Sequence, residues 1–377
     1  MVSRIIKNIK DFNKPFYIYR KKNLKDSVNF FLKNFNGIVI YALKANSEPL
    51  IIKHLIKFGI RCFDAASINE IILIKKISPN AEVFFMNPVK SREAIKLAYF
   101  NYGVKNFVLD SLVELQKINE QTNFANDLNL FVRIDIPNKY SKVNLSNKFG
   151  AKQTEIFEIL EKTNNFASKI GICFYTGSQC LNPKAYINAI RKVSKIIDKL
   201  NFKLDFLNIG GGFPSSYTDF IPKCLADYFK KINNEFNKIK QNDIVMLSEP
   251  GRVIVADSMS LIVRVELRKE NNLYINDGVH GGLRDAMLNN FNYPVKLFFS
   301  KRKISKTLRP FSFYGPTCDS NDYMKGPFYL PKNIEEGDLI EIGKLGAYSK
   351  SLSSSFNGFE IEKRMIKVND QEFKNER

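Results

Sequence analysis

The sequence predicts an α/β protein in which a (β/α)8 barrel of the TIM type is joined to a C-terminal β-rich domain of the sandwich or barrel kind. Short apolar runs alternate with amphipathic segments, and the early repeats recur about every 22–24 residues. Eight such units fit into roughly 230 residues, the usual size of this barrel. After about residue 255, short strand-like runs joined by Gly and Asn turns replace the helical segments.

The predicted barrel strands are short, rich in Ile, Val, Leu and Phe, and followed by polar or glycine residues, as is typical of buried parallel strands. They cover residues 37–43, 60–64, 82–86, 106–110, 129–135, 170–176, 205–209 and 243–248. Between them, residues 48–58 and 184–200 place apolar side chains at helical spacing. A doubly wound open sheet uses the same units and is the alternative fold.

The domain boundaries follow from the same change of pattern. We expect the barrel at residues 20–255 and the β-rich domain at residues 1–19 and 256–377. The strands expected in this domain are 261–267, 272–276 and 294–299. The run from Pro15 to Tyr19 also has strand character, so the N-terminal segment is expected to join the same domain.

Composition excludes several classes of function. No apolar run approaches the ~18 residues that a membrane span needs, and the N-terminus has no secretory apolar region. The five cysteines are scattered without metal-ligand spacing, which favours a reduced cytoplasmic protein without a metal site. The net charge of +20 is spread along the chain, which argues against a nucleic-acid partner. A site for a dicationic substrate must then be locally acidic.

Lys44 closes the first predicted strand and is the first candidate for chemistry. A lysine amine that is desolvated at a strand end has a lowered pKa and becomes a nucleophile. Such an amine forms an imine with an aldehyde such as pyridoxal phosphate. The alternative is a lysine whose ammonium reaches solvent from the strand end and has no chemical role.

Polar or glycine residues follow all eight predicted strands, and barrel enzymes carry their chemistry at that edge. The first residue of each cluster is Lys44, Asp64, Asn87, Asp110, Arg133, Gly177, Gly210 and Glu249. A glycine triplet at 210–212 lets backbone amides approach an anion, although glycine runs are also ordinary loops. Glu249 is suited to keeping a pyridine nitrogen protonated; its alternative is a salt bridge, for example to Arg252.

Several motifs resemble one known family. Tyr-Ala-Leu-Lys44-Ala-Asn, Gly-Gly-Gly-Phe-Pro and Glu249-Pro-Gly-Arg252 look like motifs of the fold-type III, alanine-racemase-like decarboxylases that use pyridoxal phosphate. Gly-Pro-Thr-Cys318-Asp319 and Gly-Ala-Tyr348 resemble the ornithine/lysine decarboxylases of the eukaryotic and alphaproteobacterial type. The motifs occur in the expected order over nearly the whole chain.

The resemblance implies roles for individual residues. Lys44 would carry the cofactor, Asp64 would support that lysine, Glu249 would pair with the pyridine nitrogen, Arg133 would approach O3′ and Tyr175 would stack on the ring. The implied phosphate ligands are Ser178, Gly211, Gly212, Gly251, Arg252 and Tyr348.

The implied assembly is a head-to-tail homodimer with two shared active sites. In it, Cys318 of the partner subunit would protonate the carbanion left after CO₂ departs, and Asp319 of the partner subunit would bind the distal ammonium of the substrate. A lone cysteine is otherwise a small buried hydrophobe.

Two positions depart from the family pattern. Tyr175 stands where the family usually has a histidine that stacks on the cofactor ring, and His280 stands where it usually has tyrosine. An aromatic face can still stack, but it supplies no imidazole chemistry. His280 is either a loop residue or a site residue, and Asp285 is a candidate for binding the distal amine.

The leading functional prediction is decarboxylation of L-ornithine to putrescine, for polyamine synthesis. Lysine is one methylene longer, a difference worth only ~1–3 kcal/mol, so the sequence does not separate the two substrates. Diaminopimelate decarboxylases tend to carry Cys-Glu where this chain has Cys318-Asp319. The remaining alternative is a catalytically impaired relative that binds the cofactor or a regulatory partner.

Overall fold

The structure is a computed structural model that describes residues 13–136, 140–143, 148–289, 292–359 and 363–368. The chain divides into two compact units. The first, here called the barrel unit, is Val28–Pro214 with Pro222–Gly251. The second, here called the β-rich unit, is Met1–Ser27, Ser215–Ile221 and Arg252–Arg377.

Eight parallel strands of the barrel unit close into a barrel in the order β10-β11-β2-β3-β4-β5-β6-β8. Their bounds are β2 (Ile38–Ala42), β3 (Cys62–Ala65), β4 (Glu82–Phe85), β5 (Asn106–Leu109), β6 (Asn129–Arg133), β8 (Lys169–Cys173), β10 (Phe206–Asn208) and β11 (Val245–Ser248). Pairing of Leu247 with Ile38 joins the last strand to the first. The predicted barrel is therefore confirmed, and the open doubly wound sheet is not the fold.

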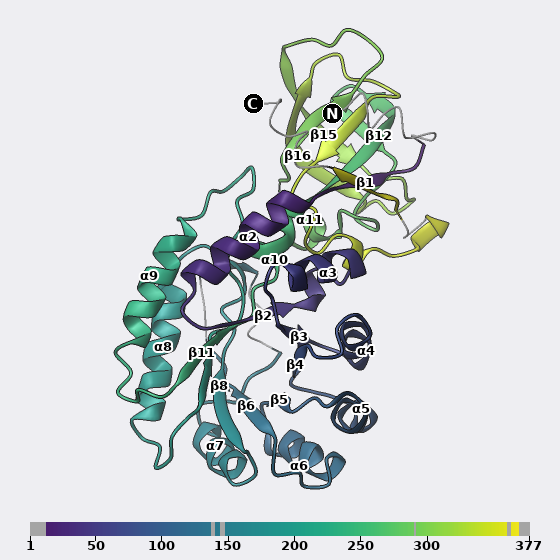
Figure 1. Cartoon of the computed structure of the whole chain (residues 1–377). Coiled ribbons are helices and arrows are strands. Elements are labelled where there is room, and N and C mark those ends of the chain that lie inside the picture. The colour runs from purple at the N-terminus through teal and green to yellow at the C-terminus, as the bar shows by residue number, and fades with distance from the viewer. Residues whose placement is uncertain (1–12, 137–139, 144–147, 290–291, 360–362, 369–377) are drawn as a thin grey trace. The chain divides into compact units, whose positions relative to one another are not determined.

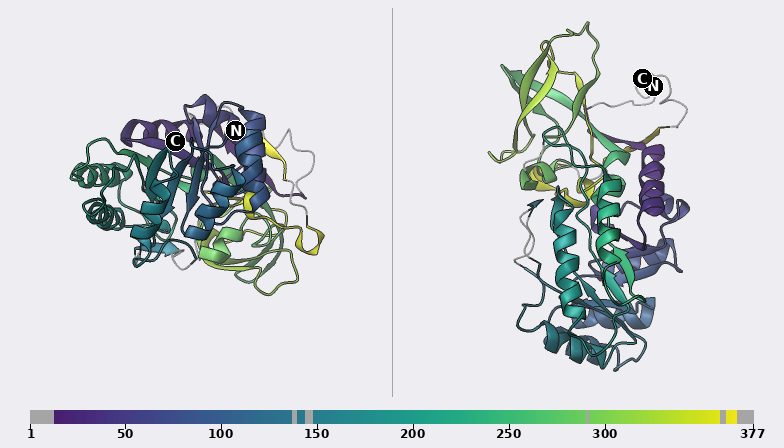
Figure 2. Two further views of the ribbon diagram at one scale, coloured as in Figure 1. Left: turned by 90° about the horizontal axis from the view of Figure 1, so that it is seen from below. Right: turned by 90° about the vertical axis from the view of Figure 1, so that its left-hand side faces the viewer.

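Helices lie outside these strands (Figures 1 and 2). They are α3 (Pro49–Lys57), α4 (Ile68–Ile77), α5 (Arg92–Tyr102), α6 (Leu112–Gln121), α7 (Ile156–Asn164), α8 (Lys184–Ile197) and α9 (Leu225–Phe236). Ser67, Ser91 and Ser111 cap α4, α5 and α6, because each side chain accepts a hydrogen bond from the N–H three residues later. These caps let each helix begin soon after its strand, which keeps the strand-end loops short.

Apolar side chains fill the barrel interior. Ile40, Phe84, Val108, Phe131 and Leu247 belong to one buried cluster, and the ring centres of Phe84 and Phe131 are 5.8 Å apart. A barrel packed in this way is a core rather than a pore, so small molecules must bind at its rim. The interior also accounts for the apolar runs from which the strands were predicted.

A short antiparallel pair, β7 (Ser141–Val143) with β9 (Ser178–Cys180), lies outside the closed barrel. It was not predicted, because three-residue strands have no periodicity to detect. The helix α2 (Lys21–Asn34) begins in the β-rich unit and ends in the barrel unit. Its last part packs Phe31 against Phe213 and Phe229, with ring centres 5.1 and 4.9 Å away.

The β-rich unit is built on an eight-stranded sheet with the path β14-β17-β12-β13-β15-β16; β1 is added beside β12, and β18 is added beside β1. The bounds are β1 (Phe16–Arg20), β12 (Met259–Lys269), β13 (Asn272–Ile275), β14 (Val295–Phe299), β15 (Leu308–Tyr314), β16 (Tyr323–Pro331), β17 (Leu339–Ile342) and β18 (Met365–Val368). Among the described residues of this unit, the short helices α10 (Arg252–Val255) and α11 (Arg284–Asn289) accompany the sheet.

The N-terminal strand joins this sheet as the sequence indicates. Phe16 pairs with Ile262 in antiparallel register, and Tyr17 pairs with Met365 in parallel register. Phe16, Ile18 and Ile262 belong to the core cluster of the unit. Among the residues described, no helix is both long enough and apolar enough to span a bilayer.

Candidate active site

Four of the residues predicted for the site lie at the carboxyl ends of barrel strands. Lys44 is in the 3-10 turn Leu43–Ala45 directly after β2, and Asp64 is the third residue of β3. Arg133 is the last residue of β6, and Glu249 follows β11 directly. Parallel strands end at a common edge, so these side chains belong to one rim of the barrel.

Lys44 and Asp64 form an ion pair, with Nζ 2.9 Å from Oδ2. The Lys44 side chain is 44% exposed, whereas that of Asp64 is 1% exposed. The prediction of a desolvated amine is therefore wrong, because a buried carboxylate rather than an apolar wall faces the ammonium. The other carboxylate oxygen, Asp64 Oδ1, is buried and has no hydrogen-bond partner in the part of the chain that is described. The pair thus offers an accessible amine and an unused acceptor.

Glu249 is held by Asn208, whose Nδ2 donates a hydrogen bond to Oε1 over 2.7 Å. The backbone N–H of Glu249 also donates to the carbonyl of Gly210. Burial and the negative charge of Asp64 raise the pKa of Glu249 to about 7, while Lys44, Asn208 and Arg133 oppose the shift. A carboxyl group with this pKa can hold or release a proton near neutral pH, as acid–base chemistry requires.

The glycine triplet lets three strand-end loops come into contact. A Cβ on Gly211 would lie 2.4 Å from the carbonyl oxygen of Glu249, and one on Gly212 would lie 2.2 Å from that of Gly177. Gly212 also has φ +92°, which favours glycine. The loops after β8, β10 and β11 can thus pack together only because side chains are absent here.

A second close approach fixes Gly251 beside the Lys44 segment. A Cβ at Gly251 would be 2.8 Å from the Cβ of Ala45, and the N–H of Ala42 donates to the carbonyl of Pro250. The Glu249 loop is therefore held against the turn that carries Lys44. Ser178, another predicted phosphate ligand, is the first residue of β9.

Tyr175 and Arg133 lie near each other in the barrel unit. The guanidinium carbon of Arg133 is 5.8 Å from the Tyr175 ring centre and 5.4 Å from that of Phe149, within cation–π range. The Tyr175 ring also lies next to Gly211, since a Cβ there would be 3.7 Å from Tyr175 Cε2. Tyr175 thus borders the glycine loop.

Arg252 and Asp285 form a buried ion pair inside the β-rich unit, with Nη1 2.5 Å from Oδ2 and side-chain exposures of 5% and 4%. Arg252 Nη1 also donates to Tyr217 Oη, and its guanidinium lies 4.7 Å from the ring centre of Tyr348. Two predicted phosphate ligands therefore contact each other. Asp285, a candidate for the distal amine of the substrate, is placed against Arg252 instead of facing solvent.

Cys318 and Asp319 lie in the loop between β15 and β16. Cys318 is exposed, and its backbone N–H donates to Asn357 Oδ1. Asp319 Oδ2 lies 2.7 Å from His280 Nε2, and Asp319 Oδ1 accepts hydrogen bonds from the backbone and side chain of Asn321. An exposed thiol thus stands beside a carboxylate that already has partners.

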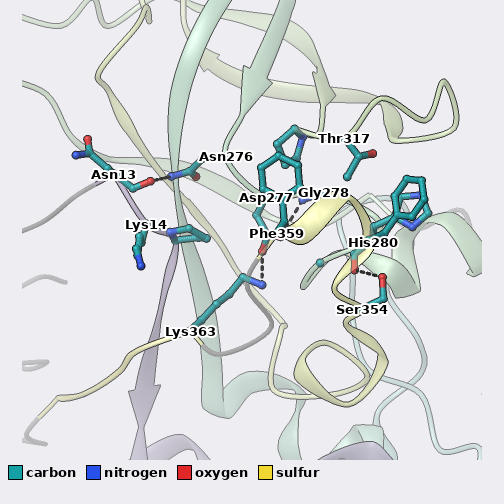
Figure 3. A pocket seen from close by; sticks show the side chains of 15 residues that line it. Asn13, Lys14, Asn276, Asp277, Gly278, His280, Thr317, Ser354, Phe359 and Lys363 are labelled. Carbon is teal, nitrogen blue, oxygen red and sulfur yellow. Dashed lines mark hydrogen bonds and ion pairs between the residues drawn. The ribbon is translucent and has the colours of Figure 1, made fainter.

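A cavity of about 250 Å³ opens next to this loop in the β-rich unit (Figure 3). Its lining includes Asp277, His280, Thr317, Ser354 and Lys363. The ammonium of Lys363 is 3.4 Å from the carboxylate of Asp277, and both side chains are buried. His280 therefore belongs to a cavity wall, and its role as a site residue stays a prediction.

Sequence reasoning missed two partners. Asn208 ends its strand just before the glycine triplet, and a polar residue at that place is a usable signal. The pairing of His280 with Asp319 joins residues 39 positions apart, and no local pattern indicates it.

Comparisons with known proteins agree with this geometry. Residues 21–256 match the family model described as pyridoxal-dependent decarboxylase, pyridoxal binding domain. The lysine/ornithine decarboxylase of Selenomonas ruminantium is 29% identical over 369 residues, or 95% of this chain and 91% of that protein. Antizyme inhibitor 2 of Xenopus laevis is 32% identical over 347 residues, or 85% and 73%. The crystal structure of lysine/ornithine decarboxylase from Vibrio vulnificus with putrescine gives a TM-score of 0.84 at 26% identity, covering 98% of each chain.

Proposed function

We propose that this chain, which belongs to the pyridoxal-dependent decarboxylases and uses pyridoxal phosphate, converts L-ornithine to putrescine. Its relatives support decarboxylation of a basic amino acid, and ornithine is the specific substrate proposed here. One observation carries the proposal. The accessible Lys44 amine is paired with buried Asp64 at the barrel rim, and both charges act on the Glu249 carboxyl group.

The residues at the rim fit the cofactor. Lys44 provides the amine for covalent attachment, and Asp64 retains an unused buried acceptor beside it. Glu249 has the proton affinity to share a proton with a pyridine nitrogen, and Tyr175 with Arg133 offers an aromatic and cationic flank. For the phosphate we propose Ser178, Gly211, Gly212, Gly251, Arg252 and Tyr348.

Each residue then has a distinct task. When bound, the cofactor ring takes up the electron pair that the leaving carboxyl group releases. Glu249, held by Asn208, keeps a proton at the ring nitrogen, while Lys44 anchors the cofactor. Cys318, supplied by a second copy of the chain in a homodimer, donates the proton that replaces the carboxyl group.

The five cysteines are free thiols, which supports a reducing compartment such as the cytoplasm.

Asp319 carries the choice of substrate. The chain has a net charge of +20, so a substrate with two ammonium groups needs a local carboxylate to bind. Asp319 provides one beside Cys318, and this favours ornithine or lysine over diaminopimelate, whose distal end bears a carboxylate. An aspartate at this position, where diaminopimelate decarboxylases tend to carry glutamate, does not by itself separate ornithine from lysine.

The test is turnover by purified protein reconstituted with pyridoxal phosphate. Ornithine, lysine, arginine and diaminopimelate are supplied separately, and CO₂ and the amine product are measured. We expect release with ornithine at the highest kcat/KM. CO₂ release with lysine alone would show that lysine, and not ornithine, is the substrate. No release with any of the four amino acids would overturn the decarboxylase proposal.

The second candidate is a cofactor-binding regulatory relative without turnover. The similarity to antizyme inhibitor 2 and the replacements at Tyr175 and His280 favour it. Lys44, Glu249 and Cys318 are all present, which favours the enzyme. A visible absorbance band that borohydride abolishes, in a protein that releases no CO₂, would select the regulatory candidate.

A further inference from the structure

His280 is one of only two histidines in the chain, and its ring is held next to Asp319. Its Nε2 is 2.7 Å from Asp319 Oδ2, with side-chain exposures of 16% and 25%. The ring centre of Phe356 lies 4.6 Å away at an angle of 34°. Behind the ring, the backbone carbonyl of His280 accepts hydrogen bonds from the N–H and hydroxyl of Ser354 (Figure 3).

Both oxygens of Asp319 already have donors. Oδ2 faces the imidazole, and Oδ1 accepts from Asn321 N and Nδ2 at 2.9 and 3.0 Å. The backbone N–H of Asn321 and then the His280 side chain hold the pKa of Asp319 below its usual range. Asp319 is therefore ionised at neutral pH and carries the negative charge of the pair.

The space on one side of the His280 ring is open, and the Asp319 side chain is itself 25% exposed. His280, Ser354 and Phe356 line both the 250 Å³ cavity and a second, wider hollow of about 730 Å³, which also includes Arg284. A cation that reaches Asp319 must share the carboxylate with the imidazole. The charge on His280 thus enters directly into the affinity for that cation.

We propose that His280 is a positioning and specificity-determining residue that sets how strongly Asp319 binds the distal ammonium of the substrate. The inference rests on the proposed function. Neutral His280 donates Nε2–H and orients Asp319, leaving a net charge of −1 for the ammonium. Protonated His280 donates from the same atom but cancels that charge, so a dicationic substrate binds more weakly.

Other charged groups border the same region. Lys14 and Lys363 lie in the wall of the smaller cavity, and Arg284 lies in that of the wider hollow. Asp277, paired with Lys363, has its pKa raised by burial. These groups are the same in wild type and in the His280 variants. Only a difference in the pH dependence of KM between these proteins is therefore assigned to His280.

The experiment measures KM and kcat for L-ornithine from about pH 5.5 to about pH 7.5, the range in which an unperturbed imidazole changes charge. It compares wild type with His280→Gln, which retains a neutral N–H donor. His280→Tyr serves as the second variant. His54→Gln is the matched control, since His54 lies on α3 and stacks on Phe58. L-norvaline, which lacks the distal ammonium, is the control substrate.

In wild type we expect the KM for ornithine to fall about tenfold as pH rises, as for a typical coupling between two charged sites. His280→Gln and His280→Tyr lose this dependence, and His54→Gln keeps it. The KM for norvaline does not follow it in any of the proteins. Because Glu249 acts on the cofactor, its titration enters kcat in wild type and variants alike.

Two results would overturn the inference without touching the proposed function. One is an active enzyme whose KM profile is the same in wild type and both His280 variants. The other is an equal pH dependence for norvaline, which would place the effect at the α-amino acid end. Wild-type protein that turns over no basic amino acid defeats the proposed function, and this inference with it.

Discussion

The two units of the chain build their candidate site residues in different ways. In the barrel unit, Lys44, Asp64 and Glu249 lie at or directly after the carboxyl ends of strands, and the parallel register brings these ends to a common rim. In the β-rich unit, Arg252 with Asp285 and His280 with Asp319 are pairs brought together across loops. The first arrangement needs only regular strands and glycine loops, whereas the second depends on specific long-range partners. Substitutions in the barrel unit should therefore change chemistry, and those in the β-rich unit should change stability or substrate affinity.

The largest effect is expected for Lys44→Ala. Removing the amine that anchors the cofactor should lower kcat by at least ~10³-fold and abolish the borohydride-sensitive absorbance band. Lys53→Ala is the matched control, because Lys53 is an exposed lysine of α3. Steady-state kinetics and absorbance spectra check both variants. If Lys44→Ala turns over substrate as fast as wild type, Lys44 and the barrel rim do not take part in the reaction.

The next effect is expected for Glu249→Gln, which keeps the shape but not the charge. Loss of the carboxylate opposite the ring nitrogen should lower kcat by about 10²- to 10³-fold. In wild type, cofactor affinity should rise with pH as Glu249 ionises around its pKa of about 7. Glu249→Gln should lose this rise in a fluorescence titration with pyridoxal phosphate.

Glu249 should have the opposite effect on the stability of the cofactor-free chain, which is expected to fall as pH rises. The folded pKa of Glu249 lies above its ordinary value of 4.5, so the folded state binds more protons between these pH values. Its contribution to stability then falls as pH rises from 4.5 to about 7. Glu249→Gln should unfold at higher urea than wild type at alkaline pH and show little difference at acid pH. Equal urea midpoints for wild type and Glu249→Gln at both pH values would contradict the raised pKa of Glu249.

In the β-rich unit, Asp285→Asn should act on stability. It leaves a buried guanidinium without its carboxylate and should lower the free energy of unfolding by about 3 kcal/mol or more. Asp26→Asn is the control, since it breaks the exposed pair with Lys22 in the same unit and should cost less than about 0.5 kcal/mol. Urea unfolding measures both, and equal effects would show that burial of the Arg252 pair does not matter.

The smallest effect is expected for Asn208→Ala. Loss of the hydrogen bond to Glu249 should lower kcat about tenfold, the usual size for a bond to a charged group. It should also move the ionisation of Glu249 to higher pH, because Asn208 opposes the raised pKa. Asn129→Ala removes a 2.8 Å amide hydrogen bond at the start of β6 and should leave kcat unchanged. If Asn208→Ala has the same pH profile of kcat as wild type, the hydrogen bond from Asn208 does not affect the ionisation of Glu249.

Local sequence signals were sufficient wherever a residue belongs to a regular repeat. Apolar runs located the eight strands, and Lys44, Asp64, Arg133 and Glu249 were predicted for the site because they lie at or next to strand ends. The 44% exposure of the Lys44 side chain was not predicted, since a strand end can be read from sequence but solvent access at the rim cannot. Asp64 was assigned to Lys44 only through the family resemblance. Asp285 was predicted to bind the distal amine of the substrate, and its burial against Arg252 follows from a contact with a residue 33 positions away in the chain.

The sequence alone determined the alternation of strands and helices and the approximate strand ends, and it favoured a closed barrel over an open sheet, because periodicity and strand ends are short-range properties of the chain. The closure of the barrel and the order of its strands come from the tertiary structure. Only the tertiary structure decided which donor meets which carboxylate: Asn208 with Glu249, Arg252 with Asp285 and His280 with Asp319. These partners are 33 to 41 residues apart, and their contact depends on how loops close over a packed core. Hydrogen bonds and ion pairs act over a few ångströms, so they are settled only after the strands have taken their register.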